Sequence, residues 1–258
     1  MSDVLYEVDD AIATITLNRP DARNAYSSQM ADGVVDALDR AEEDAAVHVV
    51  LVTGAGDAFC AGGDLKAMRD KSGMFAGDPV ELRDNYRKGL QRVPRRFDQF
   101  EKPVVAAVNG PAIGAGLDLA LMCDIRVASD RAKFGSTFAR VGLIPGDGGA
   151  YLLQRVVGFA KAVELILTAK VIDADEALDI ELVNRVVDHD QVQQQARQTA
   201  EQIASLPPKA VKMAKAALYR CVDQDIETSL QLTAALQACV QRTDEHEEAV
   251  EAVIESLK

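Results

Sequence analysis

Apolar residues recur in two different spacings along the first half of the chain. Residues 4–8 and 11–17 are rich in β-branched side chains and are separated by Asp9 and Asp10, which predicts a β-hairpin. Residues 47–53 and 103–108 are continuous apolar runs, which are typical of strands buried on both faces. The pattern therefore predicts a sheet that is covered by other elements on both sides.

Helical spacing predicts the elements between these strands. Ser27 or Ser28 caps a predicted helix that runs to about residue 43 and has one apolar face, formed by Met30, Val34, Val35, Leu38 and Ala41. A second helix is predicted over residues 80–99, with Pro94 breaking or kinking it. The glycine-containing stretch 71–79 before it predicts a mobile loop.

The second half of the chain changes in character. A helix begins near Gly114, and residues 125–129 and 132–135 predict short strands. From about residue 148 the pattern is helical almost throughout, with breaks at Gly158, near Asp173 and at a short strand over 182–186. We therefore predict an α/β fold with two parts, residues 1–199 and a helical C-terminal subdomain over 200–258.

Charge and composition narrow the function. The 258 residues carry 41 acidic and 28 basic side chains, a net charge of -13, which argues against a nucleic-acid or anionic-membrane partner. We see neither an apolar run of membrane-spanning length nor a signal peptide, so the expected location is cytoplasmic. Three His and four scattered Cys predict no metal site.

Two glycine-rich turns are the strongest chemical signal. Residues 58–65 read AFCAGGDL and residues 109–119 read NGPAIGAGLDL, and each lies between a buried strand and a helix. Unpaired amides at a helix start can bind an anion or a developing negative charge. A dinucleotide fingerprint fails, because its third glycine would fall at Leu119. Simple tight turns are the alternative for either segment alone.

Further motifs carry a family resemblance. They are Leu17-Asn18-Arg19-Pro20, Arg23-Asn24-Ala25, the two glycine-rich turns with the following Met122-Cys123-Asp124, and residues 142–149, GLIPGDGG. From about residue 4 to 255 the chain resembles the enoyl-CoA hydratase/isomerase (crotonase) superfamily. The resemblance implies a spiral of β-β-α units and an acyl-CoA substrate, with coenzyme A as part of that substrate and no separate cofactor. It also implies a homotrimer or hexamer, with the C-terminal subdomain serving oligomerisation and covering the site.

The resemblance also implies roles for single residues. The amides of Gly63 and Ala115 would stabilise a thioester enolate. The backbones of Arg23, Ala25 and Ala61 would contact the adenine, and the remaining substrate-binding positions are Asp64, Leu65, Phe138 and Pro145. Tyr26 replaces the leucine that is usual beside the adenine contacts.

The acid/base positions depart from the hydratase pattern. Hydratases of this superfamily hold a water between two Glu, and these positions are Asp118 and Phe138 here. Phe138 cannot orient water or transfer a proton. Asp147 lies in a loop that lines the acyl pocket of relatives, although it is equally suited to cap the next helix.

We therefore expect proton transfer by Asp118, with or without Asp147, and hence isomerisation or poor hydration of an enoyl-CoA. Hydrolysis, decarboxylation or dehalogenation of a specialised acyl-CoA, with Asp147 central, is one alternative. A catalytically silent CoA-binding subunit is another, and it is favoured by Phe138. A dinucleotide-dependent oxidoreductase comes third.

Overall fold

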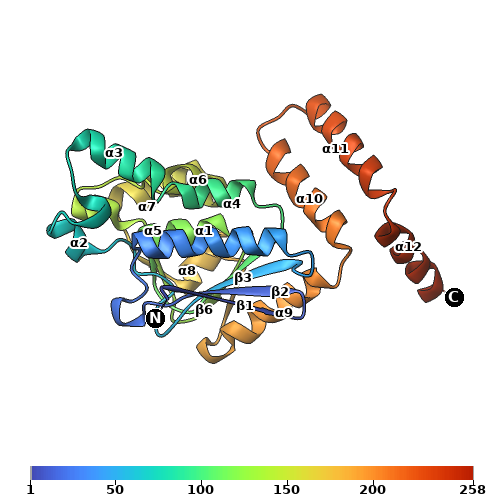
Figure 1. Ribbon diagram of the computed structural model, residues 1–258, viewed down its shortest axis with the longest axis horizontal. Coiled ribbons are helices and arrows are strands. Elements are labelled where there is room, and N and C mark those ends of the chain that lie inside the picture. The colour runs from blue at the N-terminus through green and yellow to red at the C-terminus, as the bar shows by residue number, and fades with distance from the viewer. Residues whose placement is uncertain (1, 258) are drawn as a thin grey trace.

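The computed structural model describes residues 2–257 as a mixed α/β body followed by three helices that extend from it (Figure 1). The main sheet has the order β1-β2-β3-β4-β6-β9, antiparallel between β1 and β2 and parallel elsewhere. Its strands are β1 (Val4–Asp9), β2 (Ile12–Leu17), β3 (Val49–Gly54), β4 (Val104–Val108), β6 (Ile125–Ser129) and β9 (Arg185–Val187). A smaller sheet joins β5 (Ala112–Ile113), β7 (Lys133–Gly135) and β8 (Ile172–Asp173).

The main sheet is covered on both faces, as its apolar runs predict. Every residue of β3 and β4 is buried. On one face α9 (Val192–Ala204) contributes Val192, Ala196 and Ala200 to a small apolar cluster. The other face packs into the large core, together with α1 (Ser28–Glu43), α4 (Arg92–Gln99) and α5 (Ala115–Met122). The predicted hairpin is confirmed by six β1–β2 residue pairs, from Val4 with Leu17 to Asp9 with Ile12.

Helix ends follow local chemistry closely. The Ser27 hydroxyl accepts the amide of Met30, which confirms the predicted start of α1. The prediction of a single helix over 80–99 is wrong, because the structure has two helices there, α3 (Pro79–Lys88) and α4, separated by residues 89–91. Pro94 is not the break: it lies in the first turn of α4, where its missing N–H has no intrahelical partner to lose.

The segment between the first glycine-rich turn and α3 is more ordered locally than a plain loop. It contains α2 (Leu65–Arg69), a 3-10 turn over Gly73–Phe75, and then the start of α3. Asp78 and Glu81 form a capping box at that start. The remaining helices of the body are α6 (Gly149–Val157), α7 (Phe159–Thr168) and α8 (Ala174–Asp179), with 3-10 turns at Pro20–Ala22, Thr137–Val141 and His189–Gln191.

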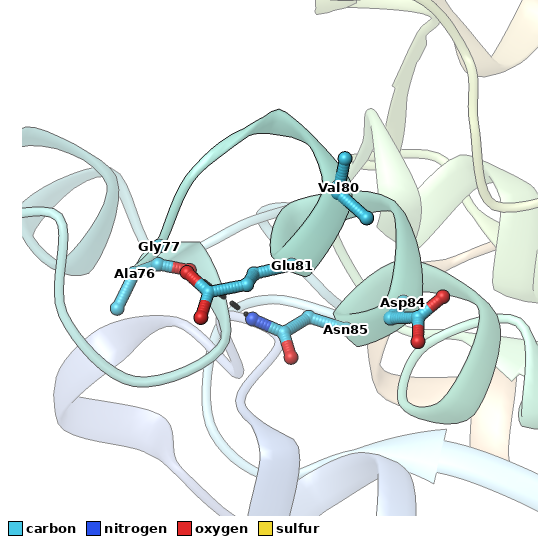
Figure 2. Close-up of a pocket in the computed structure, with 6 residues that line it drawn as sticks. All are labelled: Ala76, Gly77, Val80, Glu81, Asp84 and Asn85. Atoms are coloured by element: carbon cyan, nitrogen blue, oxygen red, sulfur yellow. Dashed lines mark hydrogen bonds between the residues drawn. The ribbon is translucent and has the colours of Figure 1, made fainter.

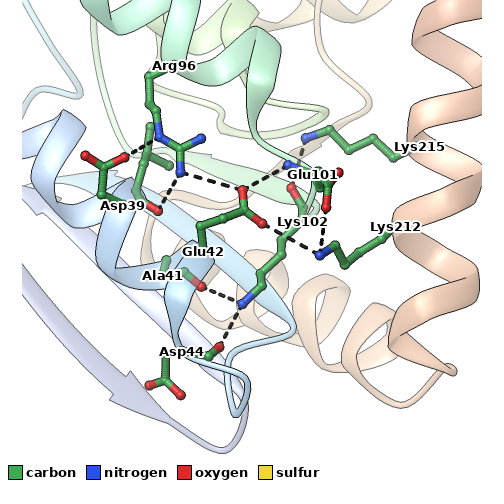
Figure 3. A network of polar contacts seen from close by, with 10 residues as sticks. Asp39, Ala41, Glu42, Asp44, Arg96, Glu101, Lys102, Lys212 and Lys215 are labelled. Atoms are coloured by element: carbon green, nitrogen blue, oxygen red, sulfur yellow. Dashed lines mark hydrogen bonds and ion pairs between the residues drawn. The ribbon is translucent and has the colours of Figure 1, made fainter.

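The last three helices are α10 (Pro208–Cys221), α11 (Ile226–Val240) and α12 (Asp244–Ser256), and they contain no buried residue. Polar contacts join α10 to the body. Lys212 pairs with Glu101 at 2.8 Å (Figure 3), and Lys215 pairs with Asp124 at the same distance. The predicted boundary at 199/200 falls inside α9, which packs on the sheet. The division into a core and a subdomain stays a prediction. Over residues 2–257, no helix combines the length and the apolar character that crossing a bilayer requires.

Candidate active site

The two glycine-rich turns meet side by side. Cys60 and Ala112 form a parallel bridge, in which the amide of Cys60 donates to Pro111 and the amide of Ile113 donates to Cys60, both at 3.0 Å. Gly62 has a φ of +95° and lies so close to this strand that an added Cβ would stand 2.6 Å from the carbonyl oxygen of Ile113. Only glycine allows this approach. The contact brings the Gly63 and Ala115 segments together.

The backbone N–H groups of Gly63 and Ala115 are available to a ligand. Within residues 2–257, neither amide donates a hydrogen bond to a protein acceptor. Ala115 is the first residue of α5, where an amide has no partner inside the helix. All residues of α5 are buried, so little solvent screens the positive end of the helix dipole.

These two residues line a cavity of about 330 Å³. Of the candidates predicted from the sequence, Ala61, Gly63, Leu65, Ala115, Phe138 and Asp147 line it, whereas Arg23, Ala25, Asp64, Asp118 and Pro145 do not. Asp64 instead caps α2 by accepting the amides of Lys66 and Ala67. The carbonyl of Arg23 accepts the amide of Ala61, which ties the Arg23–Ala25 segment to the first turn.

Asp118 does not line the cavity and is buried, with 1 % of its surface exposed. Its Oδ2 accepts the amide of Gly149 at 3.1 Å, whereas its Oδ1 has no partner in the described chain. Burial and then the negative charge of Asp147 raise the pKa of Asp118 well above the usual range, against the opposing Gly149 N–H. Gly149 must lack a Cβ, since one would overlap the Asp118 carboxyl. Asp118 therefore holds the start of α6.

Asp147 lines the cavity and is 7 % exposed. The residue that caps α6 is Gly148, with a φ of 109° and no side-chain cap, so the capping role considered for Asp147 is wrong. The Oδ1 of Asp147 is buried and has no partner among the described residues. Burial raises the pKa of this carboxyl to about 6. A carboxyl that lines a cavity and has a pKa near neutrality is suited to accept and return a proton.

Several residues that line the cavity belong to no recognisable sequence motif. Tyr26 is a departure from the family pattern, and Tyr86, Leu90 and Val171 come from segments far from the motifs. Tyr26 enters the wall because it forms a parallel bridge with Gly63. Only the folded chain brings these positions together.

Other candidate sites are weaker. An open hollow of about 370 Å³ lies at the start of α3, with Glu81 and Asp84 around it and Asn85 bonded to the carbonyl of Ala76 (Figure 2). Its side chains belong to none of the sequence motifs. Between residues 2 and 257, no group of three or more His, Cys, Asp or Glu side chains is placed to hold a metal ion.

Comparisons with known proteins agree over nearly the whole length. The sequence pattern of the enoyl-CoA hydratase/isomerase family matches residues 7–258. A short-chain-enoyl-CoA hydratase of Clostridium acetobutylicum is 38% identical over 100% of this chain and 97% of its own length. A 1,2-epoxyphenylacetyl-CoA isomerase of Escherichia coli is 34% identical over 98% and 96%. The crystal structure of an enoyl-CoA hydratase from Bacillus anthracis superposes with a TM-score of 0.92, at 33% identity and over 98% and 96% of the two chains.

Proposed function

The chain belongs to the enoyl-CoA hydratase/isomerase family, with the fold and enzyme class that its motifs predict, and we propose that it moves a proton along the acyl chain of an enoyl-CoA through an enolate. The observation that carries this proposal is the placement of Asp147 in the cavity that the amides of Gly63 and Ala115 also line. Coenzyme A enters as part of the substrate, and the reaction requires no separate cofactor.

The amides supply the first half of the chemistry. Two free N–H donors, one of them at the start of a buried helix, favour negative charge on the thioester oxygen. This charge develops when a proton leaves the α-carbon of the thioester, or leaves a carbon further along the acyl chain. Removing one such donor in other enzymes lowers the rate by about 10²–10³.

Asp147 supplies the second half. It is the carboxyl in the cavity wall, and its pKa of about 6 lets it take a proton at neutral pH and return it to another carbon. Asp118 acts through Asp147 as a positioning residue, because it binds the amide of Gly149 two residues further on. Phe138 lines the cavity without offering a second carboxyl, so a proton shuttle fits this wall better than a water held between two acids.

The test is an incubation in D₂O with trans-3-hexenoyl-CoA and, separately, with crotonyl-CoA. We expect conversion of the first to the conjugated 2-enoyl thioester, with deuterium in the acyl chain, and little 3-hydroxyacyl product from the second. Rapid hydration of crotonyl-CoA would instead make the protein a hydratase, as the name of the Clostridium relative says of that protein. Recovery of both thioesters unchanged and without deuterium would instead support the alternative of a catalytically silent CoA-binding subunit.

A trimer or hexamer is also part of the proposal. The C-terminal helices α10–α12 expose large apolar side chains, which copies of the chain would cover. These side chains are Leu218, Val222, Ile226, Leu230, Val253 and Ile254. Light scattering coupled to gel filtration measures the mass directly, and a monomer at micromolar concentration would contradict this assembly. The cytoplasmic location remains a prediction from the sequence.

A further inference from the structure

Aromatic side chains are concentrated in the wall of the cavity. The whole chain has seven Phe, five Tyr and no Trp. Four of these twelve rings line the one cavity, namely Tyr26, Phe75, Tyr86 and Phe138. They come from four different segments of the chain, so no local repeat explains their meeting. A protein this poor in aromatic residues has placed a third of them around its reactive groups.

Two of the rings and one thioether flank the amide pair. The ring of Phe138 lies 3.8 Å from the place that a Cβ on Gly114 would take, next to the Ala115 amide. Tyr26 is bridged to Gly63 through the backbone, and the methyl of Met68 fills the space where a Cβ on Gly63 would stand. A thioester bound at the amides would therefore have the rings of Phe138 and Tyr26 and the thioether of Met68 as neighbours of its first acyl carbons.

Tyr86 extends this wall to Asp147. Its ring edge lies 3.9 Å from the place of a Cβ on Gly146, the residue before Asp147. The rings of Tyr26 and Tyr86 both contribute surface to this wall. Leu65, Leu90 and Val141 add aliphatic surface, and Thr137, Arg140 and Asp147 are the polar members of this wall.

We infer that the site selects thioesters whose acyl group carries an aromatic ring; the inference rests on the proposed function, since it assigns this cavity to the acyl chain. Ring pairs in offset or edge-to-face contact are stabilised beyond the area that they bury, and sulfur against a ring edge is favourable as well. A saturated ring of the same carbon number fills the same space without these contacts. An aryl group is therefore distinguished from an alicyclic one by contact chemistry rather than by size.

The experiment compares the affinity of the full-length protein for two thioesters without a carbon–carbon double bond to move, phenylacetyl-CoA and cyclohexylacetyl-CoA, by titration calorimetry. We expect the phenyl compound to bind about tenfold more tightly, which corresponds to about 1.4 kcal/mol. Tyr86→Leu should bring the ratio close to one, whereas the matched control Tyr86→Phe, which keeps the ring, should preserve it. Phe138→Leu provides a second site for the same comparison.

Equal affinity of the unmodified protein for both compounds would overturn the inference, and so would a ratio that both leucine variants leave unchanged. Failure to bind either compound would overturn it as well. This binding measurement does not depend on turnover. A protein that prefers phenylacetyl-CoA but exchanges no proton on an enoyl-CoA would contradict the proposed reaction and still support the aryl selectivity.

Discussion

The first turn of α5 and the loop before α6 each present one aspartate, and the two carboxyls have different surroundings. Asp118 in α5 is buried, does not line the cavity, and accepts a hydrogen bond from the amide of Gly149. Asp147 in the loop lines the cavity, and its side chain holds no helix end. Asp118 thus accepts a backbone amide at the start of α6, while Asp147 lies in the cavity wall. Burial raises the pKa of both, so a raised pKa alone does not distinguish a reactive acid from a structural one.

Replacing the available carboxyl should have the largest effect on activity. Asp147→Asn keeps the size of the side chain but removes the proton acceptor, so we expect α-proton exchange in D₂O to fall by about 10²–10⁴. The same variant should be more stable at pH 7, by about 3 kcal/mol, because it no longer buries a carboxylate with a raised pKa. Urea unfolding provides the second measurement. Unchanged exchange in a folded variant would remove Asp147 from the mechanism.

Replacing the structural carboxyl should mainly affect stability. Asp118→Ala leaves the buried amide of Gly149 without an acceptor, for an expected loss of about 1–3 kcal/mol in the free energy of unfolding. Asp118→Asn retains an oxygen for that amide and is the matched control, with no expected loss, because it also removes a buried carboxyl whose pKa is raised. If Asp118→Asn unfolds like the unmodified protein yet exchanges no proton, the assignment of Asp118 as a positioning residue is wrong.

The pH dependence of the rate and of the stability should report the ionisation of the Asp147 carboxyl. The base must be ionised, so kcat/KM should fall about tenfold per pH unit below a pH of about 6. Because the folded pKa is raised, the Asp147 contribution to stability is fully present below about pH 4 and is lost as the pH rises through about 6. Asp147→Asn should lack this loss. A pH–rate profile paired with urea unfolding checks both signs, and a flat profile between pH 5 and 7 would contradict the role.

Local sequence chemistry determined a large part of the fold. The β1–β2 hairpin, the buried strands β3 and β4, and the Ser27 cap of α1 all follow from short-range spacing and appear where they are predicted. Such elements depend on neighbouring residues, so the sequence contains their cause. Pro94 shows the limit, because whether a proline ends a helix depends on which turn of that helix it occupies.

The sequence by itself determined the family, the two glycine-rich turns and both candidate acids. Only the tertiary structure decided which acid faces the cavity. The sequence places Asp118 in the first turn of one helix and Asp147 just before another, and either position is compatible with a catalytic or a structural carboxyl. It also decided that Tyr26 and Tyr86 share a wall, because this depends on contacts between segments far apart in the chain. Spacing along the sequence fixes which face of its own element a residue occupies, and only packing fixes what that face meets.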